Sequence, residues 1–132
     1  MTSVIPDIEA LLVGYLGPLL GIRIVTVQPD QQAEPWVKIA QLDAKDVSGS
    51  YSERLIEYMV QFDFYAGRDE NSVDASTSAR VGRQLLAELP SYGGGDAVVS
   101  RVQFISMPHL PDPSFEPARE RYVLTANIAA HA

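Results

Sequence analysis

The amino-acid sequence predicts an α+β domain, in which two helices pack on one mostly antiparallel β-sheet of about five strands. Two observations carry this prediction. The spacing of hydrophobic residues changes from helical to alternating twice, in the order helix, strand, strand, strand, helix, strand, strand. The length of 132 residues, with 46% hydrophobic and 20% charged residues, suits one globular domain spanning residues 1–132.

The first helix is expected in "MTSVIPDIEALLVGYLGPLLGIRI". Pro6 suits a first helical turn, and the acidic residues Asp7 and Glu9 favour the positive end of the helix dipole. A basic stretch before the apolar run is missing, and glycines and a proline interrupt it, so neither a signal peptide nor a membrane span is expected. A core helix is favoured over an amphipathic helix that binds a membrane or partner. Its apolar residues recur at helical spacing: Ile8, Leu11, Leu12, Tyr15, Leu16 and Leu19.

Two short β-branched stretches follow, residues 22–29 and 36–42, and a polar turn separates them. They are typical of a hairpin or of neighbouring strands. The next polar stretch, Asp43 to Glu53, is too long for a tight turn, which predicts either a projecting contact arm or a disordered loop.

The clearest strand is "RLIEYMVQFDFYA". One set of alternating residues is apolar and predicts the core face: Ile56, Tyr58, Val60, Phe62 and Phe64. The opposite face mixes polar residues with Leu55, Met59 and Tyr65. Such a mixed face is ordinary at a protein surface, and it also suits a contact between subunits.

The second helix is expected between residues 71 and 90. Asn71 or Ser72 is the expected cap, Asp74 is expected in the first turn, and Pro90 ends the helix. Gly82 predicts a close approach of this helix to the sheet. The side chains of the stripe that contains this glycine are small in its first part and large in its second: Ala75, Ala79, Gly82, Leu86 and Leu89.

A glycine-rich turn leads to the last two strands. In the first of them, Val98, Val102 and Phe104 are expected on one face, with Val99, Ile105 and Met107 on the other. The final strand alternates in two sets, Tyr122, Leu124, Ala126 and Ile128 against Val123, Thr125 and Asn127.

Composition limits the chemistry of this chain. A net charge of -7 and a pI of about 4.6 disfavour recognition of nucleic acid, which needs clustered basic residues. With no cysteine, the chain has no disulfide, thiolate metal site or cysteine nucleophile. The two histidines show no metal-site or hydrolase spacing, so neither a catalytic site nor a cofactor is expected.

The segment "MPHLPDPSFEPARERY" gathers the remaining ionisable side chains between two strands. His109, Asp112 and Glu116 are candidates for a metal or acid–base cluster. Prolines within the segment remove backbone donors and impose extended or turn geometry. A rigid exposed loop is therefore favoured over a metal or catalytic site.

Four stretches together resemble the tail terminator (tail completion) proteins of long, non-contractile-tailed phages. The strongest is "LPDPSFEPARERYVLTANI", a Pro-Asp-Pro loop that leads through Arg-Tyr-Val into an alternating terminal strand. The others agree in order and size: "RIVTVQPD", "PWVKIAQLDA" and "EYMVQFDFYAGRDENSVDASTSARVGRQLLAEL". The resemblance covers nearly the whole chain between Arg23 and Ile128.

The resemblance implies a structural protein of the virion, with no active site or cofactor. Tail terminators form a hexameric ring that caps the finished tail tube, stops its polymerisation and offers its other face to the head-side connector. The implied partners are thus other copies of the chain, the major tail tube protein and the head-side completion protein. The implied location is the neck of the virion, after assembly in the host cytoplasm.

Two alternatives remain open at this point. One is a connector or stopper protein of the same neck region, and the other is a small soluble enzyme or ligand-binding domain. In a ring, each chain presents two different surfaces to its neighbours. The residues expected at subunit or partner contacts are Leu55, Met59, Tyr65, His109, Pro111, Asp112, Pro113, Glu116, Arg119 and Arg121.

Overall fold

The computed structural model describes residues 6–28, 34–47, 55–67, 74–93, 97–115 and 118–131. These residues form two α-helices, a short 3-10 helix and one five-stranded sheet. In chain order, the elements are α1 (Ile8–Leu20), β1 (Arg23–Val25), β2 (Trp36–Asp46), β3 (Ile56–Tyr65), α2 (Ala75–Ala87), η1 (Leu89–Ser91), β4 (Val98–Ser106) and β5 (Arg121–His131). The α+β class and the predicted order of helices and strands are confirmed.

The strands lie in the order β1-β2-β3-β5-β4. All neighbours are antiparallel except β1 and β2, which run parallel, with Arg23 opposite Trp36. Of the two interpretations of the first strand pair, the hairpin is therefore wrong and neighbouring strands are confirmed. Because β1 and β2 run in the same direction, a tight hairpin turn cannot join them.

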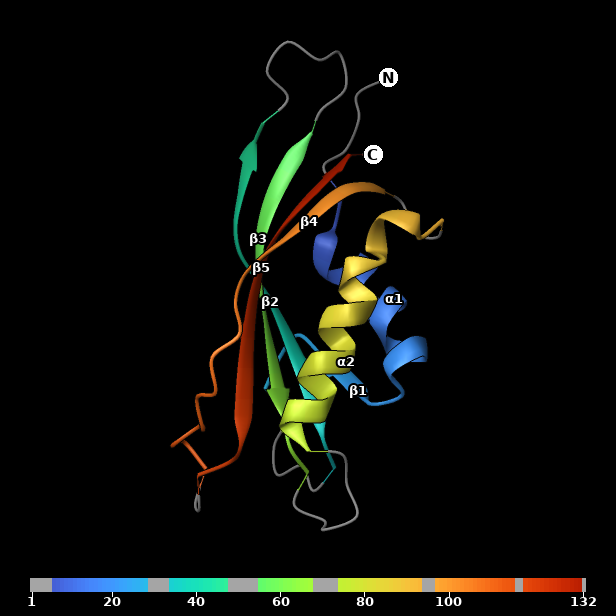
Figure 1. The fold of residues 1–132 in the computed structure, drawn as a ribbon. Coiled ribbons are helices and arrows are strands. Elements are labelled where there is room, and N and C mark those ends of the chain that lie inside the picture. Colours follow the sequence, from blue (N-terminus) through green and yellow to red (C-terminus); the bar gives the residue numbers. More distant parts are fainter. Residues whose placement is uncertain are drawn as a thin grey trace.

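Both helices pack on the same face of the sheet (Figure 1). α1 lies against β1 and β2, whereas α2 lies against β3 and β5. The predicted alternation of β3 is confirmed, since its core-facing residues contribute to one buried cluster with both helices. These strand residues are Ile56, Tyr58, Val60, Phe62 and Phe64.

Helix α1 begins after Asp7, whose side chain accepts a hydrogen bond from the Ala10 amide at 3.1 Å. It ends at Gly21, which adopts the left-handed conformation with φ 72°. One predicted core residue is misplaced, because Leu19 is 56% exposed. Leu20 packs against the core in its place, so the buried stripe shifts by one residue in the last turn. No helix in the described ranges is long and apolar enough to cross a membrane.

Helix α2 begins one turn later than predicted. Asp74 is the N-cap and accepts a hydrogen bond from the Thr77 amide at 2.7 Å, whereas Asn71 and Ser72 lie outside the described residues. The predicted small-then-large stripe is confirmed, because all five of its residues are buried. The close approach at Gly82 is also confirmed: a Cβ atom there would lie 2.6 Å from Cε1 of Phe64.

Strand β4 departs from the predicted alternation. Val98 is 53% exposed, whereas Val99 is buried together with the core. The cause is a shift of register between Val99 and Arg101, which moves the side chains from Arg101 to Phe104 by one position, and a second shift between Phe104 and Ser106 moves the following ones again. Val102 and Phe104 consequently share the core face with Val99, not with Val98.

The stretch predicted as a polar loop is partly strand. β2 continues through Asp43 to Asp46, which pairs with Ile56 of β3, and residues 48–54 lie outside the described part of the chain. The ends of β2 and β3 extend beyond both helices at one end of the sheet (Figure 1). The described ends of β2 and β3 are part of the sheet, because Ile56 also pairs with Ala130 of β5, and a projecting arm would have to lie outside the described residues.

Candidate functional site

The proline-rich segment forms an irregular hairpin that runs beside β5 (Figure 1). Its backbone is fixed by hydrogen bonds from the Leu110 amide to the Arg121 carbonyl at 2.9 Å and from the Asp112 amide to the Arg119 carbonyl at 2.8 Å. The Val123 amide also donates to the Pro108 carbonyl at 3.0 Å. We call residues 107–115 and 118–122 the proline hairpin.

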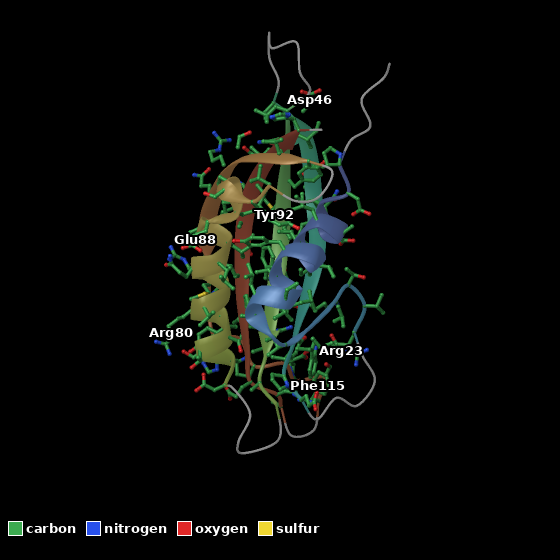
Figure 2. The ribbon with its side chains drawn as sticks, turned by 90° about the vertical axis from the view of Figure 1, so that its right-hand side faces the viewer. Arg23, Asp46, Arg80, Glu88, Tyr92 and Phe115 are labelled. Atoms are coloured by element: carbon green, nitrogen blue, oxygen red, sulfur yellow. The ribbon has the colours of Figure 1, made fainter. Side chains whose placement is uncertain are left out.

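The proline hairpin closes a small second core on the face of the sheet opposite the helices. Trp36 and Tyr65 are register partners on this face and stack with ring centroids 4.3 Å apart. Neither belongs to the main core, yet both are fully buried. Phe115 of the hairpin lies 5.8 Å from the Trp36 ring and 6.0 Å from the Tyr65 ring. Figure 2 shows Phe115 at the end of the sheet remote from Asp46.

Arg119 is a buried charged residue of this second core. Its side chain is 4% exposed, and its guanidinium carbon lies 4.3 Å from the centroid of the Trp36 ring. Its Nε donates a hydrogen bond to the Ala66 carbonyl at 2.8 Å. A planar guanidinium can stack on an aromatic ring while its edge donates hydrogen bonds, which a lysine ammonium cannot do. Arg119 therefore ties the hairpin to β2 and to the end of β3.

Asp112 also links the hairpin to the sheet, through Tyr65 of β3. It accepts hydrogen bonds from the Tyr65 hydroxyl at 2.8 Å and from the Ser114 hydroxyl at 2.7 Å. Burial raises the pKa of Asp112, but the bonds from Ser114 and Tyr65 and the charge of Arg121 outweigh it and leave the pKa below its ordinary value. Burial and the bond to Asp112 raise the pKa of Tyr65 to about 12. The carboxylate is thus charged and the phenol neutral at physiological pH.

The guanidinium of Arg121 lies close to two carboxylates, those of Asp112 and Asp63. Nη1 of Arg121 lies 3.7 Å from Asp112 and 4.0 Å from Asp63, while its Nε donates to the Leu110 carbonyl at 2.8 Å. Asp63 is buried, and this burial raises its pKa despite the hydrogen bond from Gln61 and the charge of Arg121. The pairing with Arg121 therefore compensates Asp63 only in part.

The structure corrects part of the predicted contact surface. Tyr65, Asp112 and Arg119 were expected to face a neighbouring subunit, but their side chains are buried in contacts within one chain. The reason is that the hairpin folds back over the first residues of β2 and the last residues of β3. Within the described part of the proline hairpin, the exposed candidates are His109, Pro111 and Pro113.

The candidate metal or acid–base cluster does not assemble from the residues that the structure describes. His109 bonds to Glu120 and stacks on Tyr122 at 4.8 Å, whereas Asp112 bonds to Tyr65 and Ser114. Glu116 lies outside the described residues. Across the described ranges, no three histidine or carboxylate side chains are grouped as metal ligands.

Leu55 and Met59 lie nearer to the other end of β3 and are half-buried. Between them, Glu57 pairs with Lys45 of β2 at 3.7 Å and with Arg101 of β4 at 2.8 Å. This charged row crosses the face that the helices leave open. The sequence therefore pointed to two separate regions of that face.

Sequence reasoning missed Trp36, Asp63 and Phe115 as parts of the site. A signal for Trp36 was present, because it alternates with Val37 and Ile39, whose side chains form the core face of β2. A tryptophan on the opposite set of positions indicates a second buried surface. The partner of that surface could not be found from alternation alone.

The arrangement is suited to holding a shaped hairpin in a fixed position. Its buried charges are each matched by hydrogen bonds or opposite charges, and its aromatic rings exclude water from them. No protein-family model matches the chain, and no curated protein matches it either.

Proposed function

We propose that this protein is a tail terminator of a long-tailed phage. In this proposal, copies of the chain form a ring, of six subunits by the family resemblance, that caps the tail tube and ends its polymerisation. The other face of the ring receives the head-side completion protein. The protein is then a structural component of the virion neck and has no enzymatic role.

The observation that carries the proposal is where the resembling stretches meet. Three stretches far apart in the sequence supply the second core: "PWVKIAQLDA" supplies Trp36, the stretch that begins "EYMVQFDFYA" supplies Tyr65, and "LPDPSFEPARERYV" supplies Asp112 and Arg119. The three stretches were first grouped only by their likeness to the family. In the structure, their residues pack together in one small core. This supports reading these three stretches as one family pattern.

The shape of the molecule is also suited to assembly. The hairpin presents two exposed prolines, Pro111 and Pro113, on either side of Asp112, and the second core holds this part against the sheet, so little conformational entropy is lost when a partner binds. Leu110 in this hairpin is 47% exposed. A preorganised hairpin with an exposed apolar side chain is suited to contact with another protein.

The test is polymerisation of the major tail tube protein encoded by the same genome, with and without this chain, followed by electron microscopy. We expect tubes that stop growing and carry a ring at one end. Tubes that grow unchecked, with bare ends, would overturn the proposal. Binding to the head-side completion protein without binding to tubes would favour the connector or stopper alternative instead.

Two matched variants locate the contact. Leu110→Asp changes an exposed residue of the hairpin, and Leu19→Asp changes a residue of similar exposure on α1. Both variants should remain folded, because neither side chain belongs to the core. Loss of capping in the first variant alone would place the hairpin at a functional contact, and equal activity of both would exclude Leu110 from it.

A further inference from the structure

The sheet has two open edges. β1 pairs with β2 only from Trp36 to Lys38, so the outer side of the following β2 residues faces no described strand. β4 is the last strand on the other side of the sheet, and no described strand pairs with its outer edge. We call these the β2 edge (residues 40–46) and the β4 edge (residues 98–106).

The two edges lie at the same height along the strands. The pairing across β3 and β5 places Asp46 level with Val99 and Ala40 level with Ser106. The lower part of each side is occupied, by β1 on one side and by the proline hairpin on the other. The sheet therefore has two edges of similar length, on opposite sides, along which no strand of the described residues pairs.

Each edge carries a bulge that turns out a large apolar side chain. The register of β2 skips Leu42, and the register of β4 skips Ile105. Both side chains are 51% exposed. Single exposed apolar residues are common, but these two occupy matching bulges and lie about one residue apart in height.

The surroundings of the two edges carry opposite charges. Beside the β4 edge lie Arg101, which pairs with Glu57 at 2.8 Å, and the exposed Arg83 of α2, which lies over the Phe104 ring at 4.5 Å. Arg80 is also exposed and lies about one turn earlier on α2. The β2 edge carries two exposed acidic residues, Asp43 and Asp46, and one exposed basic residue, Lys45, which pairs with Glu57 at 3.7 Å. Figure 2 shows Arg80 on the outer side of α2 and Asp46 at the far end of β2. An apolar centre flanked by complementary charges is typical of a protein–protein contact.

From these observations we propose that the β2 edge of one copy contacts the β4 edge of the next, with Leu42 against Ile105. The inference rests on the proposed function, because a ring needs two different surfaces that join head to tail. β2 and β4 run in opposite directions within one chain. A rotation about an axis along the strands preserves these directions, so the two edges of neighbouring copies meet antiparallel.

The contact is made by side chains more than by a continuous backbone ladder. Bulges and charged side chains interrupt both edges, and such features hinder regular pairing between strands. The Gln41 amide is also already bonded to the Glu9 carboxylate at 2.9 Å. These features still allow side-chain contact between the two edges of neighbouring copies. They disfavour the joining of many copies into one continuous sheet.

The absence of cysteine from the sequence makes cross-linking a direct test. Leu42→Cys and Ile105→Cys are prepared in the full chain, separately and together, and oxidised at equal protein concentration. Three strand spacings, about 14 Å, separate the two positions within a chain, which is beyond the reach of a disulfide of about 7 Å. We expect a dimer from the mixture of single variants, at least about tenfold faster than from either alone, and a ladder of oligomers from the double variant.

The control pairs Leu19→Cys on α1 with Ile105→Cys. Equal cross-linking of this pair, or of either single variant with itself, would overturn the head-to-tail contact, as would the lack of any dimer. Capping of tubes by the unmodified chain without cross-linking at Leu42 and Ile105 would overturn this contact and leave the proposed function standing. Cross-linking without capping would support the contact and overturn the tail function.

Discussion

At the scale of single residues, Gly82 shows how one missing side chain sets the distance between α2 and the sheet. An added Cβ would lie 2.6 Å from a ring atom of the fully buried Phe64. Alanine favours a helix over glycine by about 1 kcal/mol, but overpacking a core costs about 1 to 3 kcal/mol. We therefore predict that Gly82→Ala lowers the free energy of unfolding by up to about 2 kcal/mol, the overpacking cost less the helix gain, measured by urea denaturation.

Gly14 in α1 provides the matched control. Apart from the backbone of its own helix and its chain neighbours, no described atom lies within 4 Å of a Cβ built at this position, so alanine is accommodated without movement. Gly14→Ala should raise the free energy of unfolding by about 0.5 to 1 kcal/mol. If Gly82→Ala stabilised the protein to the same extent, the close contact between α2 and Phe64 would be contradicted.

Asp63 gives a prediction for the dependence of stability on pH. Burial raises its pKa in the folded chain, so its contribution to stability is lower at neutral pH and recovers as the pH falls through the folded pKa. Asp63→Asn removes this charge, and its oxygen can still accept the hydrogen bond from Gln61. We expect the variant to be more stable than the wild type at neutral pH, with a difference that vanishes in acid.

Urea denaturation of both proteins, at pH 7 and at steps down to below about 4, measures this difference. Asp112 titrates in both proteins, and its lowered pKa has the opposite effect, since its contribution is lost as the pH falls through the folded value. Comparing the two proteins at each pH removes that common effect. A variant less stable at neutral pH would mean that pairing with Arg121 outweighs the burial of Asp63.

At the same scale, the sequence analysis identified Asp112, Arg119 and Arg121 as important. It wrongly placed Asp112 and Arg119 at a contact with another subunit, whereas both are buried within the chain. Prolines and charges marked the hairpin as shaped and rigid. Arg119, however, reaches Ala66 and stacks on Trp36, both far away in sequence. Alternation tells which face a strand residue occupies, and it contains no information about which distant segment covers that face.

At the scale of elements, local patterns predicted the helices and the central strands well. The α2 stripe and the alternation of β3 were correct because each depends on neighbours along the chain. The parallel pairing of β1 and the bulges of β4 were not predicted, because both depend on register with a distant strand. The position of a bulge decides whether Val98 or Val99 joins the core.

The proline hairpin is the element that a single substitution should release. Asp112→Ala removes the partner of the Tyr65 and Ser114 hydroxyls and one carboxylate beside Arg121. Breaking such a buried charged network costs about 3 kcal/mol. We expect the Leu110 and Arg119 amides to exchange with solvent deuterium on the order of a hundredfold faster, since each bonds across the hairpin.

His109→Ala is the control for this exchange experiment. The His109 side chain is 45% exposed, and exposed ion pairs are worth at most about 1 kcal/mol. This variant should leave the hairpin amides almost as protected as in the wild type, and amides of β3 should stay protected in both variants. Equal release by both variants, or uniform release across the sheet, would contradict anchoring by Asp112.

At the scale of the whole molecule, the charge of -7 makes distant copies repel each other. The charges at the two edges nevertheless differ in sign, so short-range attraction depends on orientation. A head-to-tail contact is the arrangement that sets the arginines of one copy beside the aspartates of the next. A contact of one edge with its own copy would bring like charges together.

Reversing the charges of one edge at a time tests this arrangement. Arg80→Glu with Arg83→Glu makes the surroundings of both edges acidic, and Asp43→Arg with Asp46→Arg makes both basic. Each variant alone should associate about tenfold more weakly than the wild type, because two exposed pairs of up to about 1 kcal/mol each become repulsive. Sedimentation velocity at several protein concentrations measures the association.

A mixture of the two variants should recover what each has lost. Every acidic β4 edge then meets a basic β2 edge, and every basic β4 edge meets an acidic β2 edge, so the copies alternate around the assembly. An alternating ring closes only with an even number of subunits, which a hexamer satisfies. A mixture no larger than its separate components, under conditions in which the wild type associates, would contradict the opposed charges of the two edges.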